Sequence, residues 1–259
     1  MKRFSLSGFQ LKYIALITMV FDHIHYFFDY TGKIPIWFAM IGRLAAPLFL
    51  FAVIEGFVHT HNRKKYFLRI YALAILMGLI QFGFYNFLHP LVRPDGFFPQ
   101  NMMLSSDKKY LKGIPTLLFP ILLPLLMLPF YLLSVNKPML GFLLKLLNFT
   151  VLPVHTFISD GGTWLLLTGI AMYLCHKNLK KEVLAFVSVS LVWVLMAIVL
   201  SRPSFQDLMF RYIEWMEIFA APLMLCYNGQ RGKGSKYLFY VFYPTHIYLL
   251  YALSVIFYR

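Results

Sequence analysis

The sequence contains few charged residues. Only 13% of its 259 residues are Asp, Glu, Lys or Arg, whereas 60% are hydrophobic and 19% are aromatic. A soluble domain of this length cannot bury so much apolar material, because about a quarter of the residues in such domains are charged. The composition therefore excludes a soluble globular protein and predicts a polytopic membrane protein.

Cysteine is scarce as well, which excludes a disulfide-stabilised scaffold. Cys175 and Cys226 lie near predicted cytoplasmic helix ends, where disulfides rarely persist, and we interpret them as buried thiols. No repeat, low-complexity tract or soluble domain is visible. His59 and His61 have a spacing that a metal ion accepts, but no carboxylate or cysteine set completes such a site, so no metal is predicted.

Long apolar runs dominate the chain instead. A bilayer core of about 30 Å requires about 20 apolar residues per helix. Nine runs approach this length, at residues 10–29, 35–57, 66–88, 114–134, 139–158, 162–176, 183–200, 212–228 and 237–257. The run at 114–134 is the least regular because four prolines interrupt it. The sequence predicts a single all-α membrane domain over residues 1–259 with about nine spans, eight and ten being the alternatives.

The basic residues indicate how these spans are oriented. The chain has 24 Lys and Arg against 10 Asp and Glu, but they are interleaved with the spans, which argues against nucleic acid as a partner. The short loops 62–65, 177–182 and 229–236 are all basic, and the positive-inside rule places them in the cytoplasm together with the N-terminus. No small-residue cleavage site follows Lys2 and Arg3, so we interpret the first run as a retained span.

Titratable residues inside the first two runs are the candidates for function. Asp22 and His23 lie in the first run, and Arg43 and Glu55 lie in the second. A charge at the bilayer centre costs about 2.5–3.5 kcal/mol, so such residues converge on a protein-lined or wet interior. Adjacent helical residues diverge by about 100°, and Asp22 and His23 therefore serve different faces. Histidine is suited to proton transfer near neutral pH, although a lone buried histidine also serves simply to hydrogen-bond a neighbouring helix.

Two proline kinks add further candidates. Pro47 frees the carbonyl of Arg43, whose guanidinium is suited to clamp a carboxylate or to polarise an acyl oxygen. The alternative is a structural Asp22–Arg43 ion pair. In the last run, Tyr243 and His246 flank Pro244 and share one helix face.

Three segments carry a resemblance to a known family. Residues 14–28 hold the membrane-embedded Asp-His pair, residues 41–70 hold a series of Arg, Pro, Glu, Gly and His, and residues 227–251 hold a Tyr-Pro-Thr-His motif after a basic turn. With these segments the chain resembles the TraX family, which acetylates the N-terminus of the conjugative pilus subunit. The spacing between Lys12 and His23 is also similar to the Arg/Lys-x10-His pattern of larger membrane acyltransferases.

The resemblance implies an acetyl-CoA-dependent N-acetyltransferase in a bacterial inner membrane. Its partners would be membrane lipids, acetyl-CoA, and the amine of a peptide, protein or small-molecule acceptor. The implied catalytic residues are Asp22, His23, Arg43, Glu55, Tyr243 and His246. The implied contacts to the polyanionic CoA are the basic residues at the cytoplasmic end, which are Lys12, His59, Arg63, Lys64, Lys65, Arg231 and Lys233.

Two non-enzymatic interpretations remain open. A secondary transporter also places ionisable residues on proline-broken helices, although no inverted repeat is visible. A membrane assembly or immunity factor would use the same residues only for helix packing. CoA bound to the purified protein would distinguish the enzyme from both.

The topology can be tested by thiol labelling in intact cells. We expect single cysteines at positions 63, 180 and 232 to be protected from an impermeant reagent and one at position 259 to be labelled, because only this orientation puts every short basic loop inside. The reverse labelling pattern would contradict the predicted orientation.

Overall fold

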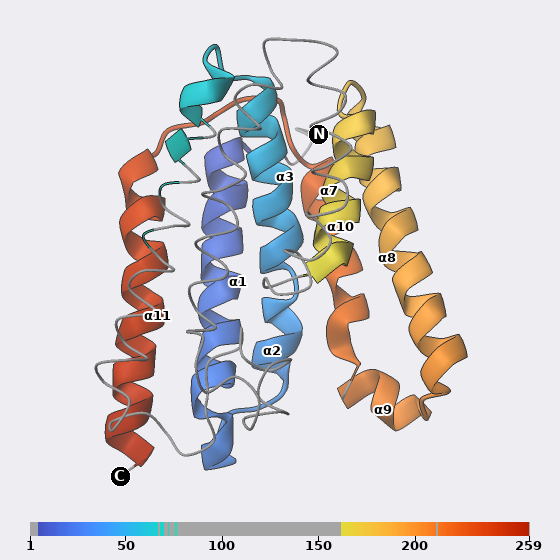
Figure 1. Cartoon of the computed structure of the whole chain (residues 1–259), viewed down its shortest axis with the longest axis vertical. Helices are drawn as coiled ribbons and strands as arrows, with labels where there is room; N and C mark the ends of the chain where they lie inside the picture. The colour runs from blue at the N-terminus through green and yellow to red at the C-terminus, as the bar shows by residue number, and fades with distance from the viewer. Residues whose placement is uncertain are drawn as a thin grey trace, which may run out of the picture. The chain divides into compact units, whose positions relative to one another are not determined.

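The computed structural model describes residues 5–66, 68–69, 72, 76, 162–210 and 212–258. These residues form helices and the turns that join them, apart from one isolated bridge between Leu6 and Tyr227 (Figure 1). The predicted all-α class is therefore confirmed for this part of the chain. Two compact units are present, one with residues 1–66 and 167–259 and the other with residues 67–166. The predicted spans 114–134 and 139–158, and nearly all of 66–88, lie outside the described residues.

The first predicted span is the helix α1, Gly8–Phe28. It begins at a capping box in which the Ser7 hydroxyl accepts a hydrogen bond from the backbone N–H of Gln10, while the Gln10 side chain accepts one from the backbone N–H of Ser7. It continues into the short 3₁₀ helix η1, Asp29–Thr31, and Gly32 then turns the chain with a φ of 65°. Glycine suits this left-handed conformation because it has no Cβ.

The second predicted span is divided into α2, Trp37–Gly42, and α3, Ala45–Val58. The division lies just before Pro47, which has no N–H to offer the carbonyl of Arg43, so the predicted kink is confirmed. Within the described ranges, one helical stretch, Trp37–Val58, is both long and apolar enough to cross a bilayer. The nine-span bundle therefore stays a prediction.

The later helices follow in chain order. They are α7, Gly162–Cys175; α8, Leu179–Ser201; α9, Phe205–Phe210; the 3₁₀ helix η5, Ile213–Phe219; α10, Ala220–Leu225; and α11, Lys236–Tyr258. The run at 212–228 was expected as one continuous span but is a 3₁₀ helix followed by a short α-helix. Pro222 explains part of the difference, because it lacks the N–H that would bond the carbonyl of Ile218.

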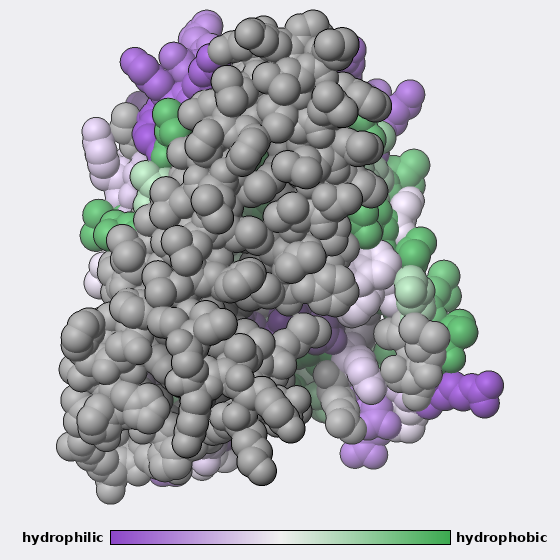
Figure 2. All heavy atoms as spheres, viewed as in Figure 1, coloured by the Kyte–Doolittle hydropathy of each residue, from purple (hydrophilic) through white to green (hydrophobic). Residues whose placement is uncertain are grey.

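The buried core joins five of these helices. Its fully buried side chains come from α1, α3, α7, α8 and α10, namely Leu11, Leu48, Phe51, Met172, Phe186 and Met224. The opposite face of α8 carries exposed apolar side chains, including Leu184, Leu195 and Val199, and Figure 2 shows hydrophobic residues along this flank. A helix that is apolar on both its buried and its exposed faces is typical of a membrane environment.

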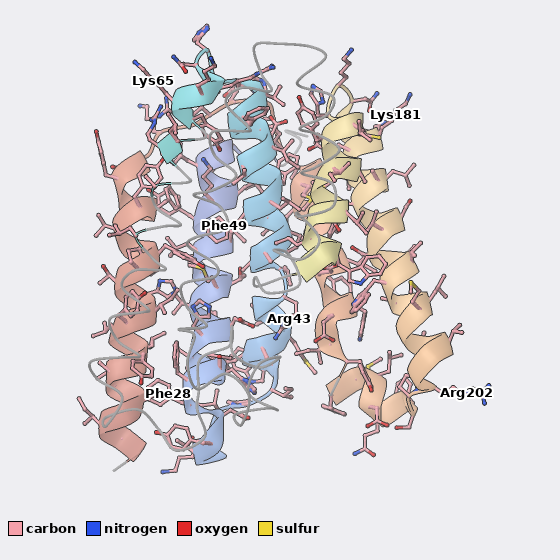
Figure 3. All side chains as sticks on the ribbon, in the orientation of Figure 1. Phe28, Arg43, Phe49, Lys65, Lys181 and Arg202 are labelled. Carbon is pink, nitrogen blue, oxygen red and sulfur yellow. The ribbon has the colours of Figure 1, made fainter. Side chains whose placement is uncertain are left out.

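α1 and α11 run side by side in the same direction. Tyr13 packs on Phe239 with ring centroids 5.5 Å apart, and further along both helices the Tyr30 hydroxyl donates to the carbonyl of Ser254 over 3.1 Å. Both helices begin at the end of the unit where Figure 3 shows Lys65 and Lys181, whereas Arg202 lies at the other end. The short basic loops thus share one end, as the positive-inside rule requires.

Gly42 lets α1 and α2 approach each other closely. A Cβ atom built on Gly42 would lie 2.3 Å from the Cβ of Asp22, a distance that real Cβ atoms do not show. Any larger residue would therefore separate the two helices at the point where Asp22 meets Arg43.

This close approach predicts the effect of a single methyl group. Gly42→Ala is expected to cost about 1–3 kcal/mol of stability through overpacking, and to lower the Tm by about 2–4 °C for each kcal/mol. Gly169→Ala is the matched control, because its new methyl would meet only the flexible end of Leu50 at 3.2 Å. Equal melting temperatures for the two purified variants would contradict the role of Gly42.

Candidate functional site

The structure brings His23 and His246 into direct contact. Nδ1 of His23 on α1 lies 2.8 Å from Nε2 of His246 on α11, and the two ring planes are within 11° of parallel. The two residues are 223 positions apart in the chain. The pair therefore depends on the parallel packing of α1 and α11.

The hydrogen-bond partners define which ring nitrogen carries a proton. Nδ1 of His246 lies 2.8 Å from the carbonyl oxygen of Phe242, which can only accept, so this Nδ1 carries the hydrogen and donates. In the neutral ring, Nε2 of His246 is then an acceptor, and Nδ1–H of His23 donates to it. This assignment leaves a lone pair on Nε2 of His23, the arrangement that a general base requires.

Aromatic rings enclose the histidine pair. Phe242 lies parallel to His246 with centroids 4.9 Å apart, and Tyr243 meets the same ring edge-on at 5.8 Å. Phe27 packs edge-on against His23 at 6.3 Å. His246 is only 6% exposed, so its contact with His23 is shielded from bulk water. The predicted catalytic residue Tyr243 thus lies beside the pair.

The pair lies well inside both helices. His23 follows Lys12 by three helical turns, or about 16 Å of helical rise, and His246 lies about 15 Å beyond the start of α11 at Lys236. Because both helices begin at the basic end, a molecule that reaches the pair from that end must extend about this far.

Asp22 and Arg43 form the ion pair that the sequence left as an alternative. Arg43 Nη2 lies 3.5 Å from Asp22 Oδ1, while the buried Nε of Arg43 has no hydrogen-bond partner among the described residues. Glu217 of η5 is close enough to Arg43 to interact with it electrostatically, and accepts a 2.7 Å hydrogen bond from the hydroxyl of Ser190 on α8. Four helices therefore contribute to one polar network.

Sequence reasoning missed Glu217 as part of this network. The signal was present, because Glu217 is a carboxylate within the predicted span 212–228, as Asp22 is within the first span. The partnership with Ser190 carries no comparable signal, since a serine in a membrane helix is ordinary.

Glu55 belongs to a different cluster near the basic end. It accepts a hydrogen bond from the hydroxyl of Tyr227 and interacts electrostatically with Glu182. Glu182 is only 1% exposed, and its Oε1 has no hydrogen-bond partner within the described part of the chain. His59 Nδ1 lies 3.5 Å from Glu55 Oε2 on the exposed side. The structure thus groups Glu55 with Tyr227 and Glu182 rather than with the histidine pair.

Lys12 and Arg231 gather around Phe9 at the start of α1. Lys12 Nζ lies 5.5 Å from the centroid of Phe9 and 5.9 Å from that of Phe239, and the guanidinium carbon of Arg231 lies 5.6 Å from Phe9. Each contact has the geometry of a cation–π interaction. Two positively charged side chains are therefore held close together near one ring, which favours the binding of a polyanion.

The turn that carries Arg231 is bound to α1 through the backbone. The N–H groups of Gly8 and Phe9 donate to the carbonyls of Gln230 and Arg231 over 2.8 and 2.9 Å. Gly232 has a φ of 77°, and a Cβ on it would lie 2.3 Å from the hydroxyl oxygen of Ser7. Because these backbone donors of α1 are already occupied, an anion at this end depends on side chains.

The other predicted CoA contacts form a second basic group after α3. The guanidinium carbon of Arg63 lies 5.3 Å from the ring of Phe57, and Lys64 and Lys65 are exposed beside it. His59 is 64% exposed, and Lys233 is exposed in the turn before α11. The predicted CoA contacts His59, Arg63, Lys64, Lys65 and Lys233 therefore extend from loops or helix ends, apart from the group formed by Lys12 and Arg231.

Comparison with known proteins finds a partial family match. Residues 7–105 match the family model described as TraX protein. The matched range covers less than half of the chain. The chain is 28% identical to the probable fimbrial assembly protein FimC, serogroup H1, of Dichelobacter nodosus, over 94% of each chain. No solved structure matches it.

The family match covers only one side of the histidine pair. Within residues 7–105 lie α1, α2 and α3, and with them His23, Asp22 and Arg43. His246 lies outside the matched range, on α11. The candidate site is therefore assembled from both ends of the chain. Among the described residues, no group of three His, Cys, Asp or Glu residues is placed to hold a metal ion.

Proposed function

We propose that this protein is a membrane-embedded N-acetyltransferase that transfers an acetyl group from acetyl-CoA to an amine. The observation that supports this most directly is the His23–His246 hydrogen bond, which orients the free Nε2 of His23 as a base. The match of residues 7–105 to the TraX model supports the same reaction class, because TraX resemblance implies acetylation.

The reaction needs one base and one orienting residue. The acceptor nitrogen attacks the thioester carbonyl of acetyl-CoA, forming the amide C–N bond and breaking the C–S bond. Nε2 of His23 takes the proton that the amine loses and returns it to the departing CoA sulfur. His246 keeps the ring of His23 in position and accepts its Nδ1–H throughout, which stabilises the imidazolium when it forms.

The oxyanion of this reaction requires a nearby donor. Tyr243 packs edge-on against His246. Arg43 is engaged by Asp22 but retains an unpartnered Nε in the described structure. We assign oxyanion stabilisation to these two residues, with Asp22 fixing the guanidinium.

The donor is proposed to enter from the basic end. Lys12 and Arg231 around Phe9, with Arg63, Lys64 and Lys65 after α3, would contact the phosphates of CoA. The helical rise from Lys12 to His23, about 16 Å, is comparable to the length of a pantetheine arm. The thioester would therefore reach the histidine pair while the phosphates stay at the surface.

The acceptor is proposed to be the N-terminal amine of a pilus or fimbrial subunit. The relative's description as a fimbrial assembly protein supports this choice. The same description also fits an assembly factor without enzymatic activity, and acetyl transfer by the purified protein distinguishes the two.

The protein is proposed to span the bacterial inner membrane about nine times with its N-terminus in the cytoplasm. The parallel direction of α1 and α11 supports an odd number of spans, because the first and last helices then cross the bilayer in the same sense. Eight and ten spans are disfavoured for the same reason.

The roles of the two histidines predict a graded effect. His23→Ala is expected to lower the rate of acetyl transfer by about 10²–10⁴-fold, the usual contribution of general base catalysis. His246→Ala is expected to have a smaller effect, because the His23 base remains but loses its orienting partner. His25→Ala is the matched control on the same helix, since His25 contacts Asp29 instead.

The measurement is acetyl transfer from radiolabelled acetyl-CoA by purified variants present in the membrane at equal levels. Wild-type turnover by His23→Ala would rule out the proposed mechanism. A larger loss in His25→Ala than in His246→Ala would show that the pair is not the site.

The basic end can be tested through the KM for acetyl-CoA. Replacing Arg63, Lys64 and Lys65 together by Gln, or Lys12 with Arg231, is expected to raise the KM about ten- to a hundredfold at low salt, because two or three phosphate contacts of about 1 kcal/mol each are lost. The rate at saturation should change little, since these contacts are equal in the ground and transition states.

Lys180→Gln with Lys181→Gln is the control, because Figure 3 shows Lys181 at the same end. The orientation of each variant is checked by thiol labelling, as these loops also direct topology. A KM that rises only in the Lys180 and Lys181 variant would move the CoA entrance to the loop before α8.

A further inference from the structure

The 3₁₀ helix η5 is unusually long. It covers the seven residues Ile213–Phe219, whereas 3₁₀ runs longer than three or four residues are uncommon and often mark functional segments. Side chains three positions apart eclipse one another in a 3₁₀ helix, so Glu214 and Glu217 lie on one face. The two carboxyl groups are close enough to interact electrostatically. An α-helix would have rotated them apart by about 60°.

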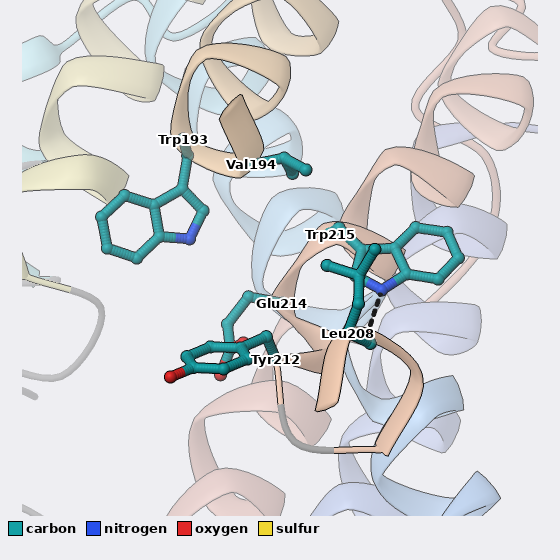
Figure 4. A pocket seen from close by; sticks show the side chains of 6 residues that line it. All are labelled: Trp193, Val194, Leu208, Tyr212, Glu214 and Trp215. Atoms are coloured by element: carbon teal, nitrogen blue, oxygen red, sulfur yellow. Dashed lines mark hydrogen bonds between the residues drawn. The ribbon is translucent and has the colours of Figure 1, made fainter. Parts of the chain in front are cut away.

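A small hollow opens beside Glu214. Its lining comes from α8, α9 and the start of η5, and consists of Trp193, Val194, Leu208, Tyr212, Glu214 and Trp215 (Figure 4). The indole N–H of Trp215 donates to the carbonyl of Leu208 over 2.9 Å, which fixes one wall. Side chains of three aromatic residues and of Glu214 thus line the same space.

This composition favours a cationic ligand. Aromatic faces attract ammonium groups, and a carboxylate adds direct charge pairing. The surroundings are acidic for this chain, since Asp207, Glu214 and Glu217 are three of only ten acidic residues in a protein of net charge +14. A negatively charged ligand would meet repulsion at the same place.

Polar groups continue from the hollow toward α1. Glu217 follows Glu214 on the shared face, and it lies near Arg43, which is paired with Asp22. Asp22 immediately precedes His23 in the chain. The hollow is therefore connected to the helix that carries the proposed base by a series of charged side chains rather than by apolar packing alone.

We propose that this hollow binds the primary ammonium group of the acyl acceptor before the amine reaches the histidine pair. The inference rests on the proposed acetyltransferase function, for which it supplies the acceptor site. Glu214 and the rings of Trp193, Tyr212 and Trp215 hold the ammonium, and Glu217 receives it next. Donor and acceptor then approach from different parts of the unit, because the hollow lies toward the C-terminal half of α8 and the basic loops lie at its N-terminal end (Figures 3 and 4).

Binding can be measured without any catalytic activity. The chain has four tryptophans, two of which line the hollow, so the full-length Trp37→Phe/Trp164→Phe variant reports on the hollow through intrinsic fluorescence. Titration with butylammonium chloride is expected to change the emission, whereas uncharged butan-1-ol is not. Adding Glu214→Gln should weaken the ammonium affinity about three- to tenfold.

Asp29→Asn serves as the matched control for charge. Asp29 lies after the end of α1, its side chain is 67% exposed, and it does not line the hollow. Its removal is expected to leave the butylammonium affinity unchanged. An equal loss of affinity in Asp29→Asn and Glu214→Gln, or no response to butylammonium at all, would overturn the proposed site.

Kinetics distinguish the acceptor site from the proposed function itself. In acetyl transfer to a peptide with a free N-terminal amine, Glu214→Gln should raise the KM for the peptide about three- to tenfold and leave the KM for acetyl-CoA unchanged. Glu214-dependent ammonium binding by a protein that transfers no acetyl group would refute the acetyltransferase and keep the cation site. If Glu214→Gln transfers acetyl groups with an unchanged KM for the peptide, the hollow is not the acceptor site. The same result is expected if the hollow binds the ammonium headgroup of a lipid instead.

Discussion

The backbone contact between the start of α1 and the turn after α10 determines much of the arrangement. Gly8 and Phe9 donate to Gln230 and Arg231, and the turn can lie this close because a side chain at Gly232 or Gly234 would collide with Ser7 or Phe9. Since α11 begins only five residues after Arg231, its first turn must lie beside that of α1. The parallel packing of the two helices, and with it the meeting of His23 and His246, follows from this contact.

Several features could be predicted from the sequence because each depends on local chemistry. The apolar runs located α1, α11 and the α2–α3 pair within a few residues, and Pro47 located the break between α2 and α3. Titratable residues in apolar runs were sufficient to select His23 and His246 individually. Their partnership was not predictable, because the relative rotation of two helices 223 residues apart is decided by packing that the sequence pattern does not encode.

Other parts of the site escaped prediction for a different reason. The sequence predicts an α-helix over residues 212–228, and in an α-helix the side chains of Glu214 and Glu217 do not eclipse each other. The sequence predicts that Glu55 faces the same interior as His23, because both residues lie within predicted membrane spans. In the structure, α3 instead directs Glu55 toward Tyr227 and Glu182. Glu182 lies at the start of α8, within the predicted loop 177–182. The sequence therefore predicts how far along a helix a residue lies, but not which neighbouring element its side chain faces.

The identity of the residue that orients the proposed base has a consequence in the proposed membrane setting. In soluble enzymes a catalytic histidine is commonly oriented by a carboxylate, whose permanent negative charge is costly to bury in a medium of low dielectric constant. Here the orienting group is a second imidazole, whose own hydrogen is held by the Phe242 carbonyl. The resting pair carries no formal charge, so it adds no ionic desolvation cost to folding. The histidine pair is charged only while a proton is in transit.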